Sequence, residues 1–105
     1  MTDAIPTQAA DPLAALTVDH FLPCLGQNFM LAAVAPHLGL RLVSAQASRH
    51  LPASGRRGFA LMFAGQVSLP QAIHKLQHPE LGTLDIFLVP IGPGEKGLQY
   101  EAIFN

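Results

Sequence analysis

The chain is 105 residues long, with 50% hydrophobic residues, 12% charged residues and a formal net charge of −1 at pH 7. This length allows one domain with one core, and six Lys and Arg residues scattered along the chain form no basic patch for nucleic acid or anionic lipid. No apolar run approaches the ~18 residues of a membrane helix, and no basic region followed by an apolar one opens the sequence, so neither a membrane partner nor secretion is expected.

The N-terminal segment, residues 1–16, is rich in Ala, Thr, Gln and Pro and is predicted to be a flexible leader. Asp11-Pro12 and Thr17 are helix-start signals, so a short helical segment is predicted before Pro23. Its apolar residues are expected to close one end of the core: Val18, Phe21, Leu22 and Leu25. The single cysteine, Cys24, cannot form an internal disulfide, which fits a cytoplasmic protein.

Four strands are predicted in the middle of the chain. Residues 28–35 are apolar on both faces, and residues 40–45 alternate between apolar and other side chains. Residues 36–39 are interpreted as the turn between them, because they contain Pro and Gly. Residues 59–64 are apolar throughout and lie between two glycines, and residues 71–78 form the fourth strand.

The last quarter of the chain predicts a hairpin around which the domain is organised. Residues 84–91 and 98–104 are strand-like, and residues 92–97 between them are rich in Gly and Pro. The first of these strands is apolar on both faces apart from Asp85, so we expect it to lie inside a sheet or barrel and not at its rim. The six strands predict an all-β, antiparallel barrel or sandwich of meander type, with a short N-terminal helical segment before it. The expected core aromatics are Phe29, Phe59, Phe63, Phe87, Tyr100 and Phe104.

Several motifs resemble a small bacterial domain family of unknown function. They are F-x4-GQ-x-F at residues 21–29, GFALMFAG at 58–65, LPQ-x6-HPELG at 69–82, IFLVPIGP at 86–93 and YEAIFN at 100–105. The resemblance covers nearly everything after Thr17. Because the motifs consist of strand and turn residues, they imply a shared fold more than a shared chemistry. The resemblance also implies a loose association with phage-tail or tail-collar-like proteins.

No catalytic or metal-binding arrangement is visible in the sequence. Cys24 has no neighbouring positive charge or base to activate it, and Asp85 and Glu101 fall on different strands. His74 and His78 are four residues apart, which in a strand separates them by about 13 Å, too far to share one ion. We expect His74 to replace a core aromatic and His78 to cap a turn. Neither an enzyme activity nor a metal or cofactor is therefore predicted.

One loop carries the candidate contact residues. Residues 48–58 are rich in Ser, Pro and Gly and predict an exposed loop. Their three arginines, Arg49, Arg56 and Arg57, could grip the phosphate or carboxylate of an anion or of a partner.

Two functions remain open on the sequence alone. A charge-poor surface with apolar residues favours a non-enzymatic interaction module, either a homo-oligomer or an assembly subunit of a phage-tail-like particle. The alternative is a carrier that holds a small apolar ligand inside a β-barrel. Bulky Phe, Leu, Met and Ile side chains in the strands should fill a barrel this small, so the interaction module is the favoured interpretation.

Overall fold

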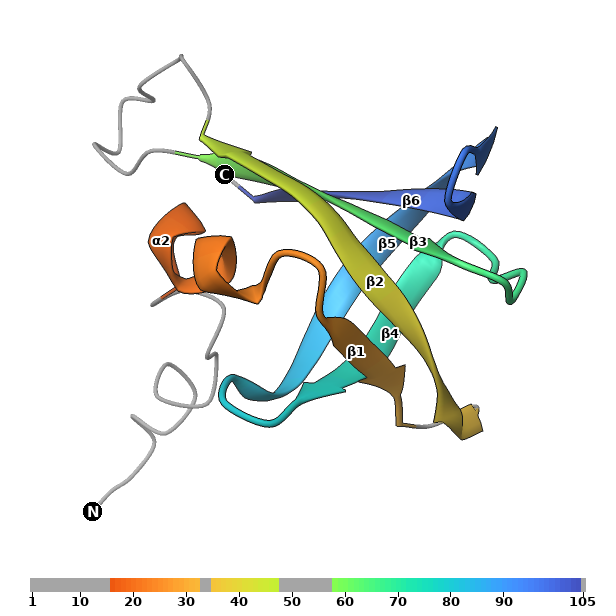
Figure 1. Ribbon diagram of the computed structural model, residues 1–105, viewed down its shortest axis with the longest axis horizontal. Coiled ribbons are helices and arrows are strands. Elements are labelled where there is room, and N and C mark those ends of the chain that lie inside the picture. The colour runs from red at the N-terminus through yellow and green to blue at the C-terminus, as the bar shows by residue number, and fades with distance from the viewer. Residues whose placement is uncertain (1–15, 33–34, 48–57, 105) are drawn as a thin grey trace.

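Figure 1 shows the computed structural model of the chain, which describes residues 16–32, 35–47 and 58–104. A short helix, α2 (Val18–Phe21), leads into a 3₁₀ turn, η2 (Leu22–Cys24). The strands are β1 (Asn28–Leu31), β2 (Ala35–Ala47), β3 (Phe59–Gly65), β4 (Ala72–His78), β5 (Gly82–Gly94) and β6 (Gly97–Phe104). No helix among these residues has the length and apolar character needed to cross a membrane.

The six strands form a closed antiparallel barrel in the order β1-β2-β3-β6-β5-β4, with β4 pairing back to β1. The all-β barrel class is thus confirmed. Its order is not that of a single meander, because β3 pairs with β6 and not with β4. Two three-stranded meanders, β1-β2-β3 and β4-β5-β6, are joined instead by residues 66–71, which lead from one to the other (Figure 1).

The first hairpin differs from its prediction. The strand predicted over residues 28–35 ends at Leu31, and the turn predicted over residues 36–39 lies within β2, which begins at Ala35. Gly39 pairs with Met30 of β1. A Cβ on Gly39 would lie 2.9 Å from the Met30 Sδ and 3.1 Å from the Phe29 carbonyl oxygen. Gly39 therefore allows β1 and β2 to approach closely. In the sequence, a glycine at such a contact looks the same as a glycine in a turn.

The strands predicted over residues 59–64 and 71–78 agree with β3 and β4 to within one residue. The terminal hairpin is also confirmed, but β5 continues through Gly94 and pairs there with Gly97. The turn is correspondingly shorter than the six residues predicted. The predicted leader lies outside the described residues except for Leu16, which packs against the core.

The core consists of inward-facing side chains from all six strands. Burial alternates along β5, where Leu84, Ile86 and Leu88 are buried and the residues between them are exposed, as expected for a sheet with one covered face. In β2, Leu42 pairs with Phe63 but Ser44 pairs with Met62, so the strand contains a bulge. The bulge reverses the alternation of inward- and outward-facing side chains along β2. Of the expected core aromatics, Phe29, Phe59, Phe63 and Tyr100 are buried and Phe104 is partly buried.

One end of the core is closed by Phe21, which is fully buried. Its ring centroid lies 5.7 Å from that of Phe59 and 5.9 Å from that of Phe104. Thr17 precedes the helix as predicted, and its backbone N–H donates to Nδ1 of His20. The expectation that Leu22 and Leu25 also close the core is wrong, because their side chains are 42% and 43% exposed.

Candidate functional site

Three exposed apolar side chains lie on the outer face of the barrel, on neighbouring strands. Ile73 of β4 is 67% exposed, Phe87 of β5 is 49% exposed and Ile103 of β6 is 56% exposed. Ile73 pairs directly with Phe87. On the other side of β5, the ladder with β6 ends at Val89 and Glu101, two residues short of Phe87 and Ile103. We call Ile73, Phe87 and Ile103 the apolar stripe.

Phe87 was expected in the core, and this prediction is wrong. It alternates with the buried Ile86 and Leu88, so its side chain points out of the barrel. β5 lies between β4 and β6, as expected for a strand inside the barrel, but apolar residues on both of its faces do not show which face is the inner one. A closed barrel of this size covers only the inner face of each strand, and nothing within the described chain packs over the outer face at Phe87 enough to bury it.

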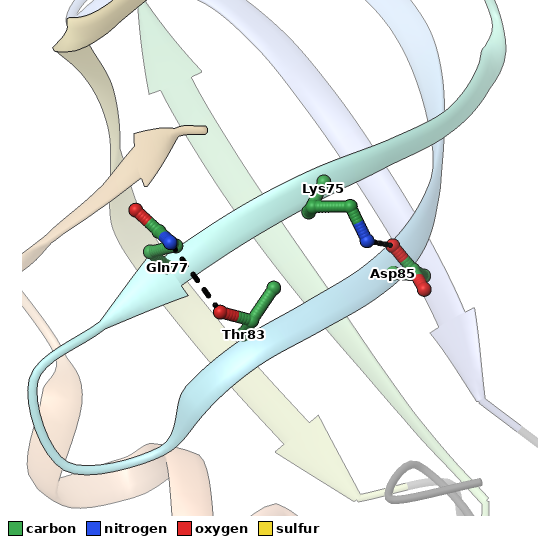
Figure 2. Close-up of polar contacts among 4 residues, drawn as sticks. All are labelled: Lys75, Gln77, Thr83 and Asp85. Atoms are coloured by element: carbon green, nitrogen blue, oxygen red, sulfur yellow. Dashed lines mark hydrogen bonds and ion pairs between the residues drawn. The ribbon is translucent and has the colours of Figure 1, made fainter. Parts of the chain in front are cut away.

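Polar side chains border the apolar stripe on β4 and β5. Lys75 Nζ lies 2.9 Å from the Asp85 Oδ1, and both side chains are exposed, at 47% and 60% (Figure 2). Two residues further along β4 and β5, Gln77 donates a 3.4 Å hydrogen bond to the Thr83 hydroxyl (Figure 2). On β6, Glu101 comes two residues before Ile103. An apolar centre with a charged border is the usual composition of a protein contact surface.

The inside of the barrel offers a contrast to this outer face. The interior side chains include Phe29, Phe63 and Tyr100 together with several leucines, and the largest of them are at most 2% exposed. The Phe29 and Phe63 rings meet edge to face at a centroid distance of 5.3 Å. This close packing favours a solid core over a ligand cavity.

His78 stabilises the turn between β4 and β5. Its Nδ1 accepts hydrogen bonds from the backbone N–H groups of Glu80 (3.1 Å) and Leu81 (3.3 Å). Nδ1 is therefore unprotonated, and Nε2 carries the hydrogen and donates it to the Gln27 Oε1 at 2.6 Å. The ring is buried and lies 4.7 Å from the Phe29 ring. The predicted turn-capping role of His78 is confirmed, and two motifs of the sequence, F-x4-GQ-x-F and HPELG, meet here.

The fold brings Cys24 and Glu80 beside His78. One ligand atom from each of the three residues lies within 4.8 Å of the others. Burial, and secondarily the negative charge of Glu80, raise the pKa of the Cys24 thiol above its ordinary value of 9.0. The thiol is therefore protonated at neutral pH. Both His78 ring nitrogens already have hydrogen-bond partners. We interpret the group as part of the turn; that no metal binds remains a prediction.

His74 does not take the place of a core aromatic, as was expected. Its side chain is only partly buried near the beginning of β4. Its Nε2 forms a 2.8 Å hydrogen bond with the Pro70 carbonyl oxygen. Its position four residues before His78 on the same strand is consistent with the view that the two do not form a shared site.

A pocket of about 380 Å³ lies between the barrel strands and the β5–β6 turn. It is lined by Asn28, Leu38, Gly39, Arg41, Ala64, Gly65, Gln66, Val67 and Lys96. Its two cationic residues, Arg41 and Lys96, are far apart in the chain, so no local sequence pattern indicates this pocket. The arginines that were predicted as contacts, Arg49, Arg56 and Arg57, lie outside the described residues.

Comparisons with known proteins identify a family. The family model described as a domain of unknown function (DUF6916) matches residues 16–104. Neither the curated proteins nor the solved structures gave a match. The matched range contains both helical turns and all six strands of the barrel, in agreement with the resemblance to a domain family of unknown function. The chain therefore belongs to the DUF6916 family.

Proposed function

We propose that this protein is a non-enzymatic contact module that associates with a second copy of itself through the apolar stripe. The observation that carries the proposal is the exposure of Ile73, Phe87 and Ile103, each about half or more, on three neighbouring strands, with Ile73 paired directly to Phe87. Burying one large apolar side chain stabilises by about 1.5–3 kcal/mol relative to leaving it exposed. A second chain laid across the stripe would gain this contribution from both copies.

The charges around the stripe favour a second copy over an unrelated partner. Lys75 and Asp85 lie side by side in the row next to Ile73 and Phe87. In a two-fold dimer the same patch faces itself. With a two-fold axis near Phe87, a lysine and an aspartate from each copy reach the border of the contact, so that opposite charges can pair across it. A stable contact of this kind buries on the order of 800 Å² on each copy.

The proposal also covers the larger particle in which the protein takes part and its location in the cell. The family resemblance, with its loose association with phage-tail proteins, supports a role as an assembly subunit of a tail-like particle. The single cysteine, Cys24, which cannot form an internal disulfide, supports a cytoplasmic location.

The proposal is tested by the mass of the protein in solution. Light scattering over a roughly hundredfold dilution should show a dimer that dissociates as the concentration falls. Phe87→Ser and Ile73→Thr should be monomeric at every concentration, with thermal stability close to that of the parent. Ile91→Thr is the matched control, because Ile91 is 48% exposed on β5 but lies outside the stripe. It should leave the dimer intact.

Two results would reject the proposal. A monomeric parent chain that copurifies with a stoichiometric apolar molecule in native mass spectrometry would favour the carrier alternative. A dimer that Phe87→Ser does not weaken would place the contact on another face of the barrel.

A further inference from the structure

The cationic side chains of the described chain are unevenly distributed. They are Arg41, Lys75 and Lys96. Lys75 forms an ion pair with Asp85. Arg41 and Lys96 both line the same pocket, and across residues 16–32, 35–47 and 58–104 neither has a carboxylate within ion-pair distance. Two like charges that share one pocket without a counter-charge repel each other, and an anion placed between them would remove that repulsion.

Glycines bring the two cations to the same place. Gly97 has φ +116°, and a Cβ there would lie 2.6 Å from the Gly65 carbonyl oxygen. The β5–β6 turn therefore passes directly against the end of β3, and Lys96, which precedes Gly97, reaches the pocket. Arg41 approaches from β2, where it pairs with Asn28 on one side and Ala64 on the other.

The remaining lining is suited to a small organic molecule with a charged end. Asn28 and Gln66 supply amide groups, which can donate hydrogen bonds to an oxyanion. Leu38 and Val67 supply apolar surface. The volume of about 380 Å³ falls near the lower end of the range for small-molecule sites. The acidic residues of the described chain, namely Asp19, Glu80, Asp85, Glu95 and Glu101, are all outside the pocket lining.

We propose that this pocket binds a small organic anion through a carboxylate or phosphate group held between Arg41 and Lys96. The planar guanidinium of Arg41 can donate two parallel hydrogen bonds to such a group. Lys96 adds a second positive charge from the facing turn. The site is separate from the apolar stripe, so its occupancy does not depend on whether the chain dimerises.

The test is a titration of the ¹⁵N-labelled protein, followed by NMR, with inorganic phosphate, phenyl phosphate, acetate and benzoate. Shifts should concentrate at the backbone amides of Gly39, Gly65, Gln66 and Lys96. Comparison of the phosphate and carboxylate series identifies the preferred group. Comparison of phenyl phosphate with phosphate, and of benzoate with acetate, measures how much the apolar side chains of Leu38 and Val67 contribute to the affinity. Arg41→Gln and Lys96→Gln should each weaken the best probe by roughly tenfold, the expected size for loss of a charged hydrogen bond.

The matched control is Lys75→Gln, which removes the same charge from an exposed strand position outside the pocket. It should leave the affinity for the best probe within about twofold of the parent, the residual long-range effect expected for a screened surface charge. Arg41→Lys should bind with intermediate affinity, since it keeps the charge and loses the paired donors. The proposal is overturned if Lys75→Gln weakens binding as much as Arg41→Gln. It is also overturned if every probe has a dissociation constant above about 10 mM.

Discussion

Tyr100 of β6 and Val67, in the connection between β3 and β4, are joined by a 2.6 Å hydrogen bond from the tyrosine hydroxyl to the valine carbonyl oxygen. The same hydroxyl accepts a 2.9 Å hydrogen bond from the backbone N–H of Leu69. The connection leads from one three-stranded meander to the other, and Tyr100 is buried beside it. One side chain therefore satisfies two backbone groups of the segment that joins the two meanders.

Replacing Tyr100 with Phe should destabilise the protein without changing its core volume. Loss of the hydroxyl leaves the Val67 carbonyl and the buried Leu69 N–H without this partner, at a cost of about 1–3 kcal/mol. Urea unfolding would measure the change in free energy. Thr83→Val, which removes an exposed hydroxyl from β5, should cost far less. Equal effects of the two substitutions would contradict the role given to Tyr100.

Phe104 and Phe87 should respond very differently to truncation. The Phe104 ring stacks on that of Phe59 at 4.5 Å with an interplanar angle of 6°, whereas Phe87 is 49% exposed. Because Phe104 is partly buried, Phe104→Ala should cost about 2–3 kcal/mol, somewhat below the full range for buried phenylalanine. Phe87→Ala should change the stability of the monomer by no more than about 0.5 kcal/mol. Thermal melts at a concentration low enough to keep the chain monomeric would show whether this order holds.

His78→Phe separates the hydrogen bonds of His78 from its packing. The phenylalanine ring can still stack on Phe29, but Gln27, Glu80 and Leu81 lose the hydrogen bonds made by the imidazole. We expect a loss of about 1–3 kcal/mol in urea unfolding. His74→Phe, at a partly exposed position with one hydrogen bond, is the comparison. A larger loss at position 74 than at position 78 would be inconsistent with the turn-capping role.

Zinc should not stabilise the protein. Binding at Cys24, His78 and Glu80 would have to remove a proton from a thiol whose pKa is raised by burial and by the Glu80 charge. It would also replace hydrogen bonds already made by the His78 ring. Thermal melts should therefore coincide in the presence of Zn²⁺ and of a chelator. A shift with Zn²⁺ that Cys24→Ala abolishes would establish a metal site at this cluster.

The Cys24 thiol should make stability fall at alkaline pH. Its pKa in the folded protein is above the ordinary value of 9.0, so the folded state binds the proton more tightly than the unfolded state does. Stability is unaffected by this group below about pH 9 and decreases as the pH rises from there toward the raised pKa, by up to ~1.4 kcal/mol per pH unit. The free energy of unfolding in urea can be measured for the parent and for Cys24→Ala over this pH range. The difference between the two values should narrow only above about pH 9. A constant difference up to about pH 10.5 would contradict the raised pKa.

Local sequence patterns were sufficient to predict the class of the fold and most of its strands. The apolar runs of β3 and β5 and the Gly- and Pro-rich turn between β5 and β6 are local signals, because each depends only on residues that are neighbours in the chain. The expectation that Phe29, Phe63 and Tyr100 lie in the core is also confirmed. His78 before Pro79 likewise predicted a capped turn, which needs only residues a few positions away.

Local patterns do not predict which apolar faces are covered or which distant residues meet, because both depend on how the strands pair. Phe87 is as hydrophobic as Phe63, and its exposure follows from closure of the barrel, which leaves the outer face of β5 bare. The pairing of β1 with β4 and of β3 with β6 brings together Cys24 and Glu80, and Arg41 and Lys96. These contacts join residues with no local relationship, and their closeness arises from the free energy of packing one core, to which every strand contributes at once.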